Sequence, residues 1–239
     1  MSKTNRHRRS MLPNEFIKWN ERMFKKFGNL RYYYHPCSLI RLVEKRRAAV
    51  ALKKLDVGSK DRILDVGCGD GFILRQIQEG EAVGLDISTA AAENAMRLCQ
   101  SKGASVVRAD GENLPFRGSC FNKIVCSETL EHTRKPKSVV DEILRVSKSN
   151  GVVVITIPHE KAINVLKTVL TRLKFFDFLL KGSPLRMDEE WHVHAFDLGL
   201  LMNLLRGKFR ILDVSRVPIA IAPLGYVVRC TRSFDHASA

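Results

Sequence analysis

A glycine-rich loop directly after a short apolar strand is the feature that most constrains the fold of this chain. Residues 63–71 read Ile-Leu-Asp-Val-Gly-Cys-Gly-Asp-Gly. Glycines permit tight backbone turns and the close approach of a ligand. Loops of this kind between a strand and a helix occur in open α/β sheets, where ligands bind at the carboxyl ends of the strands.

Strand-like and helix-like segments alternate after this loop, which predicts a mostly parallel sheet with helices on both faces. The run at 152–157 is β-branched throughout, as is typical of a buried parallel strand. We expect seven strands, at 62–66, 82–86, 105–108, 122–127, 152–157, 209–217 and 225–231. We expect the principal helices at 38–55, 72–79, 89–102, 137–148 and 196–206. The last two strands are close enough to pair, so the last strand should be antiparallel.

The length of 239 residues suits one α/β domain with extensions. We expect a basic N-terminal arm over residues 1–35 and a main domain over 36–239. Residues 160–187 interrupt the alternation as a helical, apolar and basic insertion. No run of 18 apolar residues suggests a transmembrane helix. The six scattered cysteines favour free thiols in a reducing cytoplasm.

Positive charge is concentrated near the start of the chain. Residues 1–55 contain 15 Lys or Arg and three acids, whereas the whole chain has a net charge of +15. A segment this basic predicts an anionic partner, either RNA or a membrane surface. The alternative is a solvated tail that aids solubility. We expect no DNA partner, and the oligomeric state stays open.

Two acids flank the expected ligand site. Asp65 stands directly before the glycine loop, and Asp86 ends the next strand, where a carboxylate can accept protons from two ribose hydroxyls. A dinucleotide loop needs a third small residue at position 72, but the chain has Phe72. A carboxylate before the loop also suits an ammonium group better than a pyrophosphate. The residues therefore favour a cationic, ribose-containing ligand.

Four segments in this order resemble motifs of the class I S-adenosylmethionine-dependent methyltransferases. Residues 63–71 resemble the first motif, and Asp86 resembles the ribose-binding acid. Residues 108–116 resemble the adenine-binding loop, and 121–127 the fourth-strand motif, with Asn122 where the family usually has aspartate. The resemblance implies a Rossmann-like fold and S-adenosyl-L-methionine as cofactor. The binding residues that it implies are Asp65, Gly67, Cys68, Gly69, Asp86, Ile87, Asp110, Gly111, Glu112 and Ser127.

Glu128, Glu131 and His132 follow the fourth strand and are candidates for chemistry. On a helical turn Glu128 and Glu131 share a face, with His132 one turn from Glu128. The spacing is similar to that of ubiquinone-pathway O-methyltransferases and small-RNA ribose methyltransferases, which implies a divalent metal as one interpretation. Three ligands are an incomplete shell, so a metal-free site is the favoured interpretation. General-base and purely structural roles are the other interpretations.

His192 and His194 precede the helix expected at 196–206, in a segment that resembles one closing the acceptor pocket in this family. Alternate residues of an extended segment point the same way, so both imidazoles could face the site. We therefore take His132, Glu131, His192 and His194 as the catalytic candidates. In related enzymes the region at 160–187 caps the acceptor pocket. We favour a packed lid helix there over a membrane-surface helix.

The resemblance is closest to small-molecule and ubiquinone-biosynthesis O-methyltransferases. It predicts methyl transfer to a small or lipid-like acceptor, with a hydroxyl of a quinone precursor as a candidate. One alternative is an RNA methyltransferase that uses the basic arm. A second is a non-catalytic, cofactor-binding scaffold. We expect a cytoplasmic protein, peripheral to a membrane if the acceptor is a lipid.

Overall fold

Seven strands form one sheet in the computed structural model, which describes residues 8–28, 30–100, 103–172 and 191–233. The strand order is β3-β2-β1-β4-β5-β7-β6. Their bounds are β1 Arg62–Val66, β2 Glu81–Asp86, β3 Ser105–Arg108, β4 Phe121–Ser127, β5 Ser147–Pro158, β6 Phe209–Val217 and β7 Gly225–Arg232. Only β7 runs against its neighbours among these strands. The predicted α/β Rossmann-like fold is confirmed.

The strand order places a ligand site at the middle of the sheet. The chain passes from β1 through β2 to β3 on one side and then returns to place β4 on the other side of β1. The direction in which strands are added to the sheet therefore reverses between β1 and β4. Ligands bind outside the carboxyl ends of the strands at such a switch point. The glycine loop at 67–71 begins at this edge.

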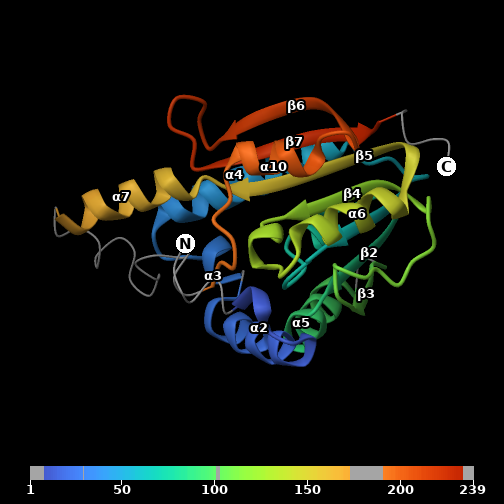
Figure 1. Cartoon of the computed structure of the whole chain (residues 1–239), viewed down its shortest axis with the longest axis horizontal. Coiled ribbons are helices and arrows are strands. Elements are labelled where there is room, and N and C mark those ends of the chain that lie inside the picture. Colours follow the sequence, from blue (N-terminus) through green and yellow to red (C-terminus); the bar gives the residue numbers. More distant parts are fainter. Residues whose placement is uncertain (1–7, 29, 101–102, 173–190, 234–239) are drawn as a thin grey trace.

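Side chains of the central strands alternate between two hydrophobic cores, one on each face of the sheet. In β1, Leu64 and Val66 enter one core, whereas Ile63 enters the other. The first core is covered by α6 (Pro136–Val146) and α10 (Leu198–Leu205), and the second by α4 (Ser38–Leu55) and the end of α5 (Thr89–Cys99). Figure 1 shows these helices on opposite sides of the strands. A strand buried on both faces explains the nearly continuous apolar runs.

The helix expected at 72–79 is wrong in extent, because only a 3₁₀ turn, η1 (Leu74–Gln76), forms there. One α-helical hydrogen bond runs from Arg75 N to Gly71 O. The next two, from Gln76 N to Ile73 O and from Ile77 N to Leu74 O, span only three residues, as in a 3₁₀ helix. Phe72, Ile73 and Leu74 are all buried. Three consecutive side chains on a helix point about 100° apart, so a regular helix cannot bury all three against one core.

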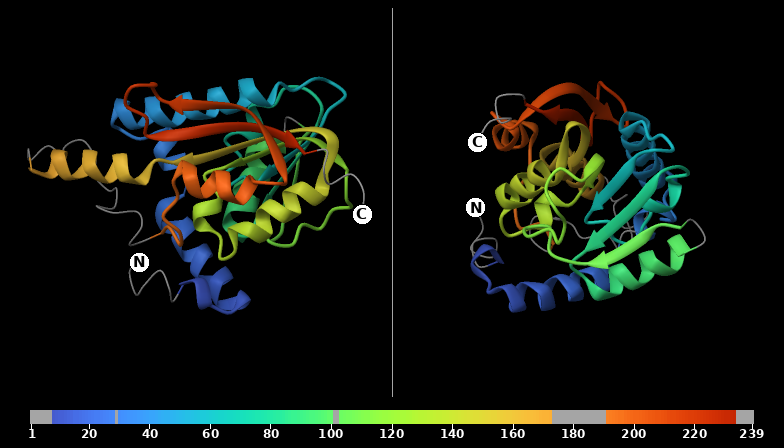
Figure 2. Two further views of the ribbon diagram at one scale, coloured as in Figure 1. Left: turned by 45° about the horizontal axis from the view of Figure 1, so that its top comes forward. Right: turned by 90° about the vertical axis from the view of Figure 1, so that its right-hand side faces the viewer.

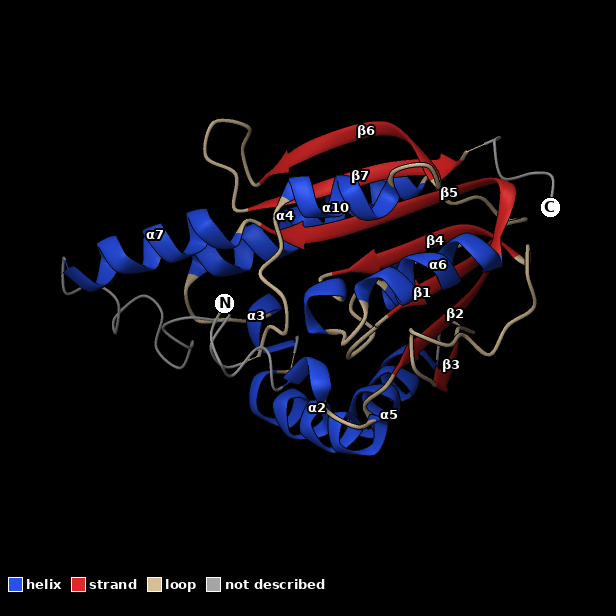
Figure 3. Ribbon diagram, viewed as in Figure 1, coloured by secondary structure: helices blue, strands red, loops and turns tan. Residues whose placement is uncertain are grey.

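Three helices lie at the carboxyl edge of the sheet. The N-terminal helices α2 (Pro13–Phe27) and α3 (Leu30–Tyr33) lie beside this edge, with α2 next to α5 (Figure 3). Helix α7 (Glu160–Arg172) follows β5 and extends away from the body (Figure 2). Residues 1–7 of the expected arm and 173–187 of the expected insertion lie outside the described residues. None of the described helices is long and apolar enough to cross a bilayer.

Candidate functional site

The glycine loop is fixed by contacts that require glycine at position 67. The backbone N–H groups of Gly67 and Cys68 both donate to the Leu85 carbonyl, at 2.9 Å each. Gly67 has φ +73°, and a Cβ there would lie 2.4 Å from Thr129. Thr129 is itself held by a hydrogen bond from its Oγ1 to the Val66 carbonyl. The loop therefore packs its backbone directly against the segment that follows β4.

Asp86 is oriented by two backbone donors at the end of β2. Its Oδ2 accepts a hydrogen bond from Gly69 N at 3.0 Å, and its Oδ1 accepts one from Ser88 N at 2.9 Å. Burial raises the pKa of Asp86 to about 6, although both hydrogen bonds oppose the shift. The carboxylate lines a cavity of about 70 Å³ at the carboxyl edge of the sheet. Ile87, Asp110, Gly111, Glu112, Gly67 and Gly69 line the same cavity.

Asp65 is buried beside this cavity with only 2% of its surface exposed. Its Oδ2 has no hydrogen-bond partner among the described residues. Burial, and then the nearby Asp86 carboxylate, raise the pKa of Asp65 to about 7. A buried carboxylate oxygen that receives no hydrogen bond suits a cationic group of a ligand, because such a group supplies both a hydrogen-bond donor and a compensating positive charge.

Helix α2 covers the small cavity, a role that the sequence did not predict. Phe16, Asn20 and Phe24 line the cavity from α2. Glu21 fixes the helix to the start of α5, because its carboxylate accepts hydrogen bonds from Ser88 Oγ at 2.7 Å and Ala90 N at 3.3 Å. The part of the chain expected to be a basic arm thus contributes a wall to the site.

A larger cavity of about 250 Å³ adjoins the first. The two share Gly67, Glu128, His132 and Trp191 as lining residues, so they meet at the end of β1 and β4. Asp65, Cys68 and Ser127 line the larger cavity, so each of the ten expected cofactor residues lines one of the two. Most other lining side chains are apolar or aromatic: Tyr32, Tyr33, Leu39, Ile40, Val43, Phe72, Ile73, Ile163, Leu166, Leu170 and Leu224.

Three polar side chains meet where the cavities join. Ligand-type atoms of Glu131, His132 and His192 lie within 4.8 Å of one another. Glu131 is fully buried, and neither carboxylate oxygen has a hydrogen-bond partner among the described residues. Burial, and then Glu128, raise the pKa of Glu131 well above its usual value. Burial, and then His192, lower the pKa of His132 well below its usual value, so His132 is neutral near pH 7.

Glu128 does not belong to this cluster, although the sequence grouped it with Glu131 and His132. Its Oε2 lies 3.2 Å from Arg47 Nη1 of α4, and its Oε1 accepts a hydrogen bond from Thr156 Oγ1. Burial raises the pKa of Glu128, and Arg47 partly offsets that rise. The described residues thus offer a divalent cation Glu131, His132 and His192. These three atoms are fewer than the six ligands that Mg²⁺ prefers.

His192 has a carboxylate partner that the sequence did not predict. Its Nδ1 lies 2.5 Å from Glu160 Oε1, and both side chains are buried. Glu160 is the first residue of α7, directly after β5, so the end of a fifth strand also contributes to the site. A carboxylate on one ring nitrogen fixes the orientation of the imidazole and favours the tautomer that carries its proton on that nitrogen.

His194 is not brought to this cluster. Its Nε2 lies 3.0 Å from the Arg134 carbonyl oxygen, and it lines neither cavity. The segment at 191–194 is irregular and is tied to η3 (Leu130–His132) by bonds from Val193 N and His194 N to the Glu131 carbonyl. Because this segment is not a strand, the alternation that would place both imidazoles together does not hold.

Comparisons with known proteins agree with the geometry. Residues 64–155 match a family model described as a methyltransferase domain. A tRNA (carboxymethyluridine(34)-5-O)-methyltransferase of Arabidopsis thaliana is 33% identical over 46% of this chain and 27% of its own length. A ubiquinone/menaquinone biosynthesis C-methyltransferase of Coxiella burnetii is 28% identical over 68% of this chain and 72% of its own length. The chain spans less than half the length of the first curated relatives that it matches.

The fold is shared with solved methyltransferases. The magnesium protoporphyrin IX methyltransferase of Synechocystis PCC 6803 with bound SAH superposes with a TM-score of 0.64 at 14% identity, covering 90% of this chain and 96% of that one. The sequence match spans the glycine loop and the strands on either side of the switch point. Residues 64–155 thus match a methyltransferase domain, and they lie within a fold shared with solved methyltransferases.

Proposed function

We propose that this chain transfers a methyl group from S-adenosylmethionine to a hydroxyl oxygen of a small or lipid-like acceptor. The observation that carries the proposal is the 250 Å³ cavity, which has mostly apolar walls and joins the Asp86 cavity at a cluster of polar side chains. Such a cavity can admit an apolar molecule and hold its one reactive polar group beside the cofactor.

Side chains of the smaller cavity, together with Asp65 where the larger cavity adjoins it, would hold the cofactor, which supplies an electrophilic methyl group on a sulfonium when bound. Asp65 would pair with the ammonium group of its methionine part, because its buried oxygen needs a donor. Asp86 would accept the ribose hydroxyls, and Asp110 the adenine amino group. Phe16 and Phe24 of α2, which line the smaller cavity, would shield the bound cofactor from water.

The acceptor hydroxyl would give its proton to His192. The Glu160 carboxylate lies against Nδ1 of this imidazole and orients the ring, and Nε2 would be the nitrogen that takes the proton. His132 and Glu131 lie in the same cluster and would position the hydroxyl oxygen. The same three side chains could instead hold a divalent cation, which would lower the pKa of a bound hydroxyl.

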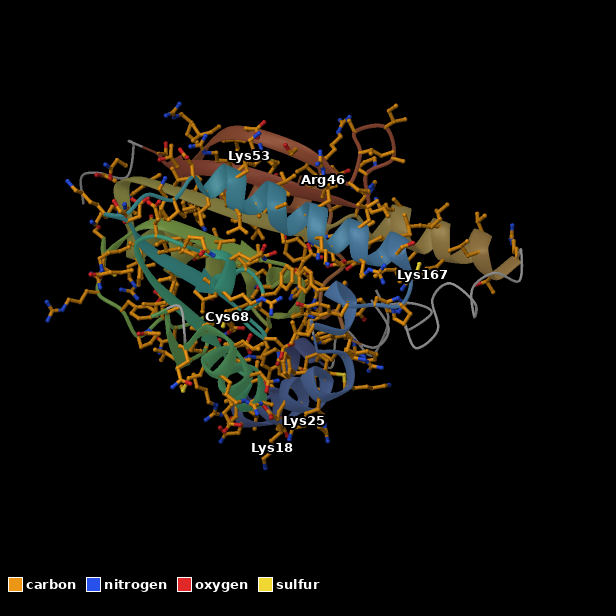
Figure 4. The ribbon with its side chains drawn as sticks, turned by 180° about the vertical axis from the view of Figure 1, so that it is seen from behind. Lys18, Lys25, Arg46, Lys53, Cys68 and Lys167 are labelled. Atoms are coloured by element: carbon orange, nitrogen blue, oxygen red, sulfur yellow. The ribbon has the colours of Figure 1, made fainter. Side chains whose placement is uncertain are left out.

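RNA methylation remains the second candidate because of one feature of the surface. Lys18 and Lys25 of α2 point away from the body, as Figure 4 shows, and they extend the basic segment at the start of the chain. One relative is named as a tRNA methyltransferase. The apolar walls of the larger cavity nevertheless suit an apolar acceptor better than a polar nucleotide.

An acceptor screen with methyl-labelled S-adenosylmethionine tests the proposal. The panel would contain hydroxylated quinone precursors, other phenols, lipids and total RNA. Label on a phenol or lipid supports the proposal, whereas label only on RNA overturns it. Cofactor binding with no label on any acceptor would favour a non-catalytic scaffold.

Variants of the polar cluster then separate the roles of its members. His192→Ala should lower turnover about 10²–10⁴-fold if this imidazole is the base. His194→Ala is the matched control and should keep near-normal turnover, because its ring bonds Arg134 outside both cavities. If a cation is used, a chelator abolishes turnover and Glu131→Gln weakens metal binding. If the cluster is only structural, the variants lose stability while folded protein stays active.

A further inference from the structure

The hairpin between β6 and β7 ends in an exposed tip without polar side chains. Residues 218–224 read Pro-Ile-Ala-Ile-Ala-Pro-Leu. Ile219 is 60% exposed and Ile221 is 96% exposed. The tip is closed at its base by a hydrogen bond of 2.7 Å from Leu224 N to the Val217 carbonyl. Exposure of two isoleucines on one ordered turn is unfavourable in water and marks an interaction surface.

The tip is attached to the root of α7. His159 N donates to the Leu224 carbonyl at 2.9 Å, and His159 Nδ1 lies 3.1 Å from the Pro223 carbonyl oxygen. Helix α7 begins at the next residue and extends away from the body on the side where the hairpin tip lies (Figures 1 and 2). It exposes Val165 and Val169, one turn apart, while Ile163, Leu166 and Leu170 line the larger cavity.

The first turns of α4 complete the same surface. Leu39 and Leu42 are exposed there, and Leu39 also lines the larger cavity. Leu224 of the hairpin is a third lining residue. Three segments distant in sequence thus each line the larger cavity, and each exposes other aliphatic side chains to solvent close to its lining residues. We call this surface the aliphatic rim: Leu39, Leu42, Val165, Val169, Ile219 and Ile221.

Exposed charges beside the aliphatic rim are positive. Lys45 and Arg46 of α4, Lys161 and Arg172 of α7, and Arg216 before the hairpin tip are exposed. Figure 4 shows Arg46 on α4, closer than Lys53 to the end from which α7 extends. The acids of α4 and α7 are turned inward, since Glu44 pairs with Arg47 and Glu160 with His192. The acids nearby are paired with lysines, Asp197 with Lys161 and Asp213 of β6 with Lys54.

We propose that the aliphatic rim docks on an anionic lipid bilayer, with the hairpin tip inserted at the boundary between headgroups and acyl chains. Aliphatic side chains beside Lys and Arg are the composition that binds such a boundary. The tip has neither the aromatic nor the hydrogen-bonding groups that bind RNA bases. Docking places the mouth of the larger cavity against the lipid, so that an apolar acceptor could enter without crossing water. Only this link to the acceptor rests on the proposed function.

Vesicle sedimentation tests the docking surface with the full chain. Wild type should bind phosphatidylglycerol-containing vesicles, bind phosphatidylcholine vesicles more weakly, and lose binding as salt is raised. The double variant Ile219→Asp/Ile221→Asp should lose about tenfold or more in partitioning to the anionic vesicles. Met96→Asp is the control, because Met96 is also apolar and is 54% exposed but lies on α5, distant from the hairpin. It should bind as wild type does.

A second measurement locates the tip directly. The fluorescence of Ile221→Trp should be quenched by brominated lipids, whereas the wild-type signal from the buried Trp19 and Trp191 should change little. Equal vesicle binding by the hairpin variant and wild type would overturn the proposal. So would binding of RNA in place of vesicles, or no quenching in vesicle-bound Ile221→Trp protein. Because these assays measure binding without turnover, they are independent of the outcome of the acceptor screen.

Discussion

Replacing Asp65 by asparagine should stabilise the cofactor-free protein and weaken its binding of S-adenosylmethionine. Asp65 is buried, and its pKa is raised from 3.8 to about 7. A shift of about three units corresponds to roughly 4 kcal/mol of unfavourable ionisation free energy above pH 7. The asparagine amide is also buried with few partners, which costs about 1–3 kcal/mol. The net gain in unfolding free energy should therefore be about 1–3 kcal/mol.

The sign of the pH dependence makes this prediction specific. A carboxyl group with a raised folded-state pKa makes its favourable contribution below the unfolded value and loses it as pH rises through the folded value. For Asp65 that window runs from 3.8 to about 7. The stability difference between Asp65→Asn and wild type should therefore grow across this window and stay constant at higher pH.

Urea unfolding of both proteins without cofactor, at pH 5 and pH 8, measures the difference. Asp141→Asn is a control, because Asp141 is partly exposed and paired with Lys137 and Lys208, so its replacement should not stabilise. Calorimetry should show that Asp65→Asn lowers cofactor affinity by about tenfold to a hundredfold. A variant no more stable than wild type at pH 8, or unchanged cofactor affinity, would refute the reasoning.

Three further predictions follow from the same geometry. Asp86→Ala should keep the fold and lose about 1.5–3 kcal/mol of cofactor binding, measured by calorimetry, because two ribose hydrogen bonds are lost. Cofactor affinity of the wild type should fall about tenfold per pH unit below about pH 7, as Asp65 takes up a proton; a flat profile from pH 5.5 to 8 would contradict its role. Gly67→Ala should destabilise the protein by more than about 2 kcal/mol in urea unfolding, because φ is positive and Thr129 blocks the new Cβ. Gly103→Ala, with a similar φ but nothing within 4 Å of its Cβ, should cost distinctly less, and equal losses would mean that Thr129 does not matter.

The sheet could be predicted because its signal is local. Each central strand is a short apolar run that ends in a turn or a polar residue, and the alternation of elements leaves few arrangements. The ten expected cofactor residues are also local, since they lie at the ends of the first four strands or in the loops directly after them. Parallel strands bring the ends of those loops to one edge, and all ten residues line the two adjoining cavities.

What the sequence did not predict depends on contacts between distant segments. Glu160 reaches His192 across 32 residues, and Arg47 reaches Glu128 across 81 positions of the chain. Neither pair has a sequence spacing from which the contact could have been predicted. Helix α2 lies within the expected basic arm, and its position over the cavity depends on Phe16 and Phe27 packing with Trp191. Such packing is set by tertiary structure and leaves no periodic signal.

The buried carboxylates explain how the site and the stability of the fold are connected. Burial raises the pKa of Asp65, Asp86, Glu128 and Glu131, so their ionised forms are unfavourable in the protein without ligand. Arg47 compensates Glu128, but Asp65 has an oxygen without a partner among the described residues. A cation bound there restores the missing interaction, so the charges that destabilise the empty fold are those that favour a cationic cofactor. Binding and folding are therefore linked through the same side chains, and the helix that covers the cavity strengthens the link by keeping water away from them.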